Sequence, residues 1–149
     1  MAKKTFQGRP LLPGELKGKA LVSRQAFNTT GSYLENMFAG VTDKAICTDA
    51  DNKELYKKDL TDCILCTTQT IGSTMGGAAF MGVTEMGVGP KALLFSSHID
   101  SVSAAGVFME DIWKDKRIIT IDMLGDDFLK TVNTGDAIAI KKDGTVEVG

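Results

Sequence analysis

Short apolar runs and helix-spaced apolar residues alternate along the second half of the chain. The runs are four to six residues long and rich in Ile and Leu, which is the length of buried strands. The segments between them carry apolar residues at a spacing of three or four, which predicts helices. The expected order is strand 63–66 (running on into 67–70), helix 76–86, strand 91–95, helix 101–115 and strand 117–122. This alternation implies a parallel sheet with right-handed crossover connections.

The helix expected at 101–115 has the most regular periodicity. Its apolar stripe consists of Val102, Ala105, Phe108, Met109, Ile112 and Trp113. Residues at this spacing share one face of a helix, so the helix is amphipathic. The helix at 76–86 is expected to stop at Gly87 and at Gly89-Pro90, because glycine ends helices and proline cannot continue them.

Further strands are expected at both ends of the chain. Residues 19–23 form a short apolar run after a turn at Pro13-Gly14, and the chain closes with runs at 137–140 and 145–148. Asp143-Gly144 between the last two is a preferred type I′ pair, which predicts a hairpin. The fold class is therefore α/β, with the additional strands forming a second sheet or a partial barrel.

The middle of the first half is more polar. Residues 28–58 contain a charged run at 49–59, which predicts a solvated loop or a short helix. Residues 63–84 carry no charge over 22 positions, but repeated glycines and polar residues indicate a buried, turn-containing segment and not a membrane span. Asp126-Asp127, after the third strand of the alternating unit, is a candidate for cation binding, although a loop end or a helix start is the favoured interpretation.

Composition and charge further narrow the class of protein and its possible partners. The chain has 149 residues, enough for one domain (1–149) with its own core. The net charge is −2 with 17 basic and 19 acidic residues and no basic stripe, which argues against nucleic acid and anionic membranes as partners. Three cysteines cannot form a complete disulfide framework, and the two N-terminal lysines precede no apolar run that would make a signal peptide. We therefore expect a cytoplasmic protein.

The strongest candidate site is the turn between the strand at 63–70 and the helix at 76–86. Gly72 lets the backbone approach a ligand, and Ser73 is expected at the N-cap position, where free N–H groups favour an anion. Ligands of parallel sheets also bind outside the carboxyl ends of the strands. The alternative is that Ser73 is merely a cap and that the glycines pack helix on strand.

The cysteines are candidates of a different kind. Cys63 and Cys66 form a Cys-x-x-Cys pair, but residues three apart in a strand point to opposite faces and cannot readily chelate one metal. Cys47 stands alone in a polar segment. We expect all three to be small core residues and the chain to contain no metal site.

His98 and Asp100 follow the strand at 91–95 and therefore lie at a carboxyl end of the sheet. A histidine with a nearby carboxylate is a candidate general base. Helix capping by Asp100 or Ser101 explains the same residues without catalysis.

Several motifs, taken in order along almost the whole chain, resemble the small subunit of the aconitase X family. They are Gly8-Arg9-Pro10, Pro13-Gly14-Glu15, the segment 18–23, Gly72-Ser73-Thr74, the segment 89–92, Ile99-Asp100 and Thr134-Gly135-Asp136. The resemblance implies the swivelling β/β/α domain of the aconitase superfamily, which closes over an active site carried mainly by a larger partner.

The resemblance also implies site residues. Ser73 matches the serine that, as an alkoxide, removes a proton from substrate carbon, and we expect Gly72, Thr74, His98 and Asp100 to contact substrate. The family places an iron or iron–sulfur centre on the large subunit, so no cofactor is expected in this chain. The chain would be a hydro-lyase subunit, a dehydratase active only as a heterodimer with that partner.

Family members dehydrate cis-3-hydroxy-L-proline or mevalonate 5-phosphate. Here Thr70, Thr74 and Gly77 depart from the usual serine turn, and 27–33 replaces a Trp-Gly-Gly segment common in relatives. Because the loop at 27–40 departs from the pattern, cis-3-hydroxy-L-proline or a related small hydroxy acid is favoured. The alternative is a non-catalytic binding or interaction module that uses the swivelling fold with another partner.

Overall fold

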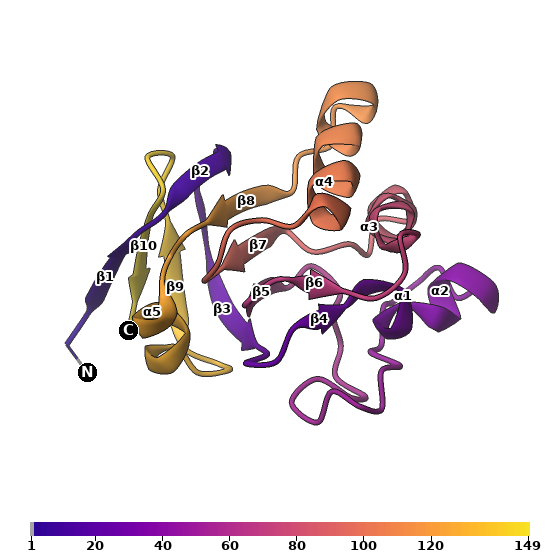
Figure 1. Ribbon diagram of the computed structural model, residues 1–149, viewed down its shortest axis with the longest axis horizontal. Helices are drawn as coiled ribbons and strands as arrows, with labels where there is room; N and C mark the ends of the chain where they lie inside the picture. Colours follow the sequence, from indigo (N-terminus) through magenta and orange to yellow (C-terminus); the bar gives the residue numbers. More distant parts are fainter. Residues whose placement is uncertain (1) are drawn as a thin grey trace.

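The computed structural model describes residues 2–149 and shows a β/β/α arrangement, with a curved sheet at one end and most of the helices at the other (Figure 1). The strands are β1 (Lys4–Gln7), β2 (Arg9–Leu12), β3 (Leu16–Val22), β4 (Phe27–Asn28), β5 (Ile64–Thr67), β6 (Thr70–Ile71), β7 (Ala92–Phe95), β8 (Ile119–Asp122), β9 (Ala137–Ile140) and β10 (Thr145–Val148). The helices are α1 (Thr29–Ser32), α2 (Leu34–Phe38), α3 (Gly76–Glu85), α4 (Ser101–Lys114) and α5 (Asp126–Thr131). The predicted alternating unit is confirmed.

The main sheet has eight strands in the order β1-β10-β9-β3-β5-β7-β8-β2. β3, β5, β7 and β8 are parallel neighbours, as the crossover helices require, and the other pairs are antiparallel. The edge strands β1 and β2 are consecutive in the chain and separated only by Gly8, so the sheet curves into a nearly closed barrel. The additional strands therefore form a partial barrel with the parallel ones. A separate small sheet contains β4 and β6.

Alternate side chains of the parallel strands enter two cores. In β3, Ala20 and Val22 point into the barrel while Leu21 points toward the helices, and β5 and β7 follow the same alternation. The barrel is closed by Phe128 and Leu129 of α5. The second core lies between the sheet and the helices and includes Phe27, Tyr33 and Phe80, whose rings pack together.

The C-terminal hairpin is confirmed, but its turn is not type I′. Gly144 has φ of +88°, whereas Asp143 is not among the residues with positive φ. The Gly144 N–H donates to the Lys141 carbonyl (3.1 Å), and the Thr145 N–H donates to the Asp143 carboxylate (2.9 Å). This is a type I turn followed by a left-handed glycine. The chain reaches it because Lys142 adds a third residue to the loop.

α4 buries a different face from its apolar stripe. Ser103, Gly106, Val107 and Glu110 are its buried residues, whereas Met109, Ile112 and Trp113 are exposed. The reason is a close backbone contact with α3: a Cβ on Gly106 would lie 2.7 Å from the Gly77 carbonyl oxygen. Small residues at the contact let the helices approach. Met109, Ile112 and Trp113 are left outside, whereas Phe108 of the predicted stripe packs against the core.

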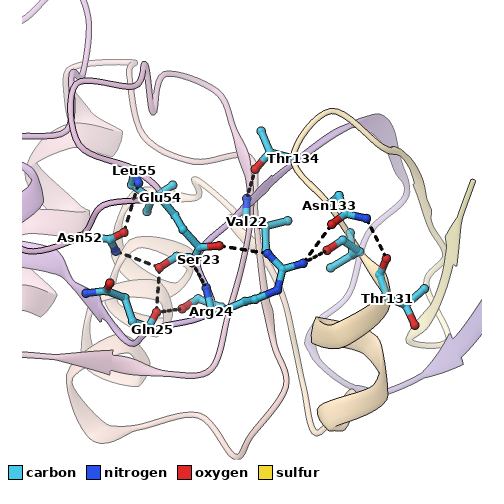
Figure 2. Close-up of polar contacts among 12 residues, drawn as sticks. Val22, Ser23, Arg24, Gln25, Asn52, Glu54, Leu55, Thr131, Asn133 and Thr134 are labelled. Atoms are coloured by element: carbon cyan, nitrogen blue, oxygen red, sulfur yellow. Dashed lines mark hydrogen bonds and ion pairs between the residues drawn. The ribbon is translucent and has the colours of Figure 1, made fainter.

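The charged run at 49–59 forms turns and not a helix. Its position is fixed by buried Asn52, which donates to Ser23 Oγ (2.8 Å) and accepts from the Leu55 N–H (3.1 Å). Arg24 joins this segment to the barrel, since its guanidinium bonds Glu54 (3.0 Å) and the carbonyl of Val132 (2.9 Å), as Figure 2 shows. The network holds the chain just before β4.

The uncharged segment 63–84 consists of β5, β6, a turn and most of α3, as a turn-containing segment should. Of the helices in residues 2–149, none has the length and apolar character to cross a membrane. The run expected to continue from 63–66 to 70 is interrupted, because Thr68 and Gln69 leave the main sheet before β6 begins.

Candidate functional site

The serine turn projects from the molecule. β6 pairs in parallel with β4, with Asn28 opposite Ile71, and then leads into the turn before α3. Every residue from 71 to 75 is exposed. Hollows of about 310 and 270 Å³ lie elsewhere, against β1, β9 and β10. Ser73 therefore lies on the surface of the domain, outside these hollows.

Ser73 is not the N-cap of α3. The helix begins at Gly76 with Met75 in the capping position, so the predicted capping position is wrong by two residues. The Ser73 hydroxyl instead accepts the N–H of Met75 (3.1 Å), and its carbonyl accepts the N–H of Gly76 (2.9 Å). An extra turn thus separates Ser73 from the helix. The hydroxyl of Ser73 thus holds the turn that leads into α3, and a catalytic role for this exposed side chain stays a prediction.

Gly72 is required at its position for two reasons. Its φ is +99°, a conformation that strains other residues, and a Cβ there would lie 2.5 Å from Asn28 Oδ1. Asn28 in turn caps α1 by accepting the Gly31 N–H (3.0 Å). The segment 27–33, which departs from the family pattern, therefore lies directly against the serine turn. Sequence analysis missed Asn28 as a site residue, although its position before Thr29-Thr30-Gly31 is typical of an N-cap.

Asp100 fixes the base of the turn. It is the N-cap of α4, accepting the Ser103 N–H (2.9 Å) and hydroxyl (3.0 Å). It also accepts the N–H (2.8 Å) and hydroxyl (2.7 Å) of Thr70. Partial burial acts to raise the pKa of Asp100, but these hydrogen bonds outweigh it and leave the pKa below 3.8. The predicted capping role is confirmed, and a direct contact with substrate stays a prediction.

His98 lies on the exposed loop between β7 and α4. Its Nδ1 is 2.7 Å from the carbonyl oxygen of Ile99, and both oxygens of the nearby Asp100 are occupied by Thr70 and Ser103. The carboxylate that supports this loop is instead the buried Asp122, which accepts the Ile99 N–H (2.8 Å) and a bidentate pair from Arg9. A histidine–carboxylate base formed by His98 and Asp100 is therefore not present in this arrangement.

The three cysteines are core residues, as predicted. Cys63 packs in the core beneath the helices, whereas Cys66 lies inside the barrel, on the other face of the sheet. Cys47 is buried although its segment is polar. Burial raises the pKa of Cys63 to about 12 and also raises those of Cys47 and Cys66, which keeps the thiols protonated.

Within residues 2–149 no three His, Cys, Asp or Glu side chains are grouped so that they could hold a metal ion. Asp126 and Asp127, which follow β8, form the first turn of α5. The interpretation of these two residues as a helix start is confirmed.

The nearly closed barrel, the helical layer and the exposed serine turn together define a swivelling β/β/α domain. The sequence profile of the aconitase X swivel domain matches residues 5–148, and the chain belongs to this family. No curated protein sequence matches the chain significantly.

Solved structures show the same fold. The chain is similar to the holo form of aconitase X from Thermococcus kodakaraensis, with a TM-score of 0.80 and 22% identity over 98% of each chain. It is also similar to the solution NMR structure of a UPF0107 protein, with a TM-score of 0.76 and 22% identity over 98% of this chain and 99% of the other.

Proposed function

We propose that this chain is the small, swivelling subunit of an aconitase X-type hydro-lyase and that Ser73 is its catalytic base. The observation that carries the proposal is the placement of Ser73 in a family domain of this kind. Its hydroxyl is exposed on a projecting turn and is held by one backbone N–H just before a helix. Such a group can be delivered into a site on another subunit.

The chemistry assigned to Ser73 is proton removal. As an alkoxide, Oγ takes a proton from substrate carbon, and the hydroxyl group on the adjacent carbon leaves. The alkoxide is favoured by the hydrogen bond from the Met75 N–H and by the positive end of the ten-residue helix α3. Gly72 and Asp100 act on its position, because one allows the turn to pass Asn28 and the other fixes Thr70.

Activation of the leaving hydroxyl is assigned to the large subunit. An iron or iron–sulfur centre does not fit the donors of this chain, since Cys63 and Cys66 lie on opposite faces of the sheet and their burial disfavours thiolates. The chain is accordingly expected to be inactive alone and active in a heterodimer.

The substrate proposed is a small hydroxy acid, with cis-3-hydroxy-L-proline ahead of mevalonate 5-phosphate. The segments that meet at the turn, 27–32, 70–79 and 98–106, contain no lysine or arginine. A phosphate would need charge-assisted donors that these segments do not supply.

The test is turnover by the reconstituted pair. The purified chain is mixed with the aconitase X large subunit of the same organism, and dehydration of each substrate is followed. Ser73→Ala should lower kcat by about 10³-fold or more, because a positioned general base contributes that much. Ser101→Ala, which removes an exposed hydroxyl at the start of α4, should change kcat less than about twofold.

Retention of more than a tenth of kcat by Ser73→Ala would contradict the assignment of the base. Association with the large subunit without turnover of either substrate would favour the non-catalytic module.

A further inference from the structure

The outward face of α4 carries large apolar side chains with nothing packed on them. Ile112 is 72% exposed and Trp113 67%, and Met109 one turn earlier is 37% exposed. With exposed Ala105 they follow the spacing i, i+4, i+7 and i+8, so they form one stripe about 12 Å long. Monomeric surfaces seldom show an ordered apolar stripe of this kind without a partner for it.

The buried face of the same helix carries an unpaired acidic group. Glu110 is completely buried, and neither of its carboxylate oxygens has a hydrogen-bond partner within residues 2–149. Trp113 lies one turn further along the helix, at the border between this buried face and the exposed apolar stripe.

The stripe is continuous with the serine turn. Val102 occupies the space beside Gly76, 2.6 Å from where a Cβ would stand, and Ala105 packs 3.4 Å from the corresponding point on Gly77. Gly76 follows exposed Met75, and exposed Ile71 lies on the other side of the turn. One apolar surface, named here the α4 stripe, thus includes Ile71, Met75, Ala105, Met109, Ile112 and Trp113.

This continuity with the serine turn indicates which partner covers the α4 stripe. If Ser73 acts on a substrate held by the large subunit, that subunit must touch the turn and therefore Ile71 and Met75. A second copy of this chain on the same surface would cover Ser73 and prevent catalysis. A folded partner that approaches the turn meets the remainder of the stripe along α4 without changing direction.

We infer that the α4 stripe is the docking surface for the catalytic large subunit, with Trp113 and Ile112 as its anchors. The inference rests on the proposed function, which supplies the partner. Buried tryptophans dominate the energetics of many interfaces, and the matching surface of the large subunit should be an apolar groove.

The experiment measures association and turnover separately. Ile112→Glu with Trp113→Glu in one variant should raise the Kd for the large subunit at least about 30-fold. In an activity titration, the concentration of large subunit needed for half-maximal turnover should rise by the same factor, whereas kcat at saturation should stay within about twofold. Ile112→Ala with Trp113→Ala should give about a tenfold rise in Kd without introducing charge.

The matched control is Phe38→Glu on α2, where the side chain is 65% exposed but does not belong to the stripe. It should leave the Kd unchanged, and all variants should keep the thermal unfolding curve of the parent. An unchanged Kd in both double variants, or an equal loss in Phe38→Glu, would overturn the inference. So would a wild-type dimer that the double variant dissociates while the large subunit still binds.

A different measurement, turnover by the Ser73→Ala variant, tests the proposed function. Ser73→Ala should bind the large subunit with the parent Kd, so retained turnover in that variant would remove the catalytic role and leave the docking measurement intact. If the wild-type chain does not bind the large subunit at all, the α4 stripe cannot be the docking surface for that subunit, and the inference is wrong.

Discussion

The barrel and the helical layer of this domain differ in how completely they bury their apolar side chains and pair their buried polar atoms. The barrel encloses an apolar interior, and α5 covers its end with Phe128 and Leu129. The helical layer with its serine turn leaves large apolar side chains on the surface and polar atoms unpaired inside. The exposed ones are Leu34, Phe38, Tyr56, Ile71, Met75, Met109, Ile112 and Trp113, with Met123 alone lying outside this layer.

The same division holds for buried polar groups. Side-chain atoms with no hydrogen-bond partner in the described part of the chain occur in Thr29, Thr30, Ser32, Tyr33, Asn36, Thr84 and Glu110, all in or beside the helices, and in Ser96 at the end of β7. Unpaired buried polar atoms cost free energy, as does exposed apolar surface. Unpaired buried polar atoms and exposed apolar side chains are thus concentrated in the helical layer, although its core also contains fully buried Phe27, Tyr33 and Phe80.

The largest difference between the regions should appear on truncation of one phenylalanine in each. Phe128→Ala removes a fully buried ring that packs edge-on against Phe6 with centroids 5.4 Å apart, and should lower the free energy of unfolding by about 3–5 kcal/mol. Phe38→Ala removes an exposed ring and should change it by less than about 0.5 kcal/mol. Urea unfolding measures both, and losses of similar size would contradict the comparison.

Much of the barrel was predictable because its strands have simple patterns. The runs at 63–66 and 91–95 alternate between the two cores, and the run at 137–140 places Ile138 and Ile140 in the barrel, so composition and length identify them. Closure into a barrel was not predictable, since it depends on β1 and β2 bending at Gly8 to reach opposite edges of the sheet.

The helical layer was predicted less well for a physical reason. Periodicity located α4 but not its buried face, because the Gly77–Gly106 contact outweighs the apolar stripe. The position of Ser73 was displaced from the N-cap by an extra turn, and Asn28 was missed because its contact with Gly72 joins segments more than forty residues apart. Such contacts between distant segments leave no local pattern.

Asp100 offers a sharper test, because both of its carboxylate oxygens are paired at the base of the serine turn. Asp100→Asn keeps the size but faces an amide N–H₂ toward the donors of Thr70 or Ser103, and should cost about 1–2 kcal/mol of stability at pH 7. The pKa of Asp100 lies below 3.8, so its contribution is present above that pH and is lost as the pH falls through the lowered value. The two unfolding curves should therefore converge in acid.

The matched control for that measurement is Asp127→Asn, an exposed carboxylate in the first turn of α5, which should change stability by less than about 0.5 kcal/mol. A gap between Asp100→Asn and the parent that stays constant down to low pH would mean that the carboxylate is not what holds Thr70.

The smallest effect on stability is expected at Glu110, and its dependence on pH is opposite in sign to that of Asp100. Burial, and then the negative charge of Glu85, raise the pKa of Glu110 above 4.5. The folded state therefore holds its proton to a higher pH than the unfolded chain, and stability is lost as the pH rises from 4.5 through the raised value. Glu110→Gln should be more stable than the parent by about 1 kcal/mol at pH 8 and equal to it near pH 4.

The neighbouring Asp111→Asn should instead be less stable than the parent at pH 8. The Arg117 guanidinium lowers the pKa of Asp111, and that pairing stabilises the fold above pH 3.8. Unfolding in urea across this pH range measures both changes, and a Glu110→Gln variant that is less stable at pH 8 would show that the buried carboxylate has a partner and that the helical layer is better satisfied than its geometry indicates.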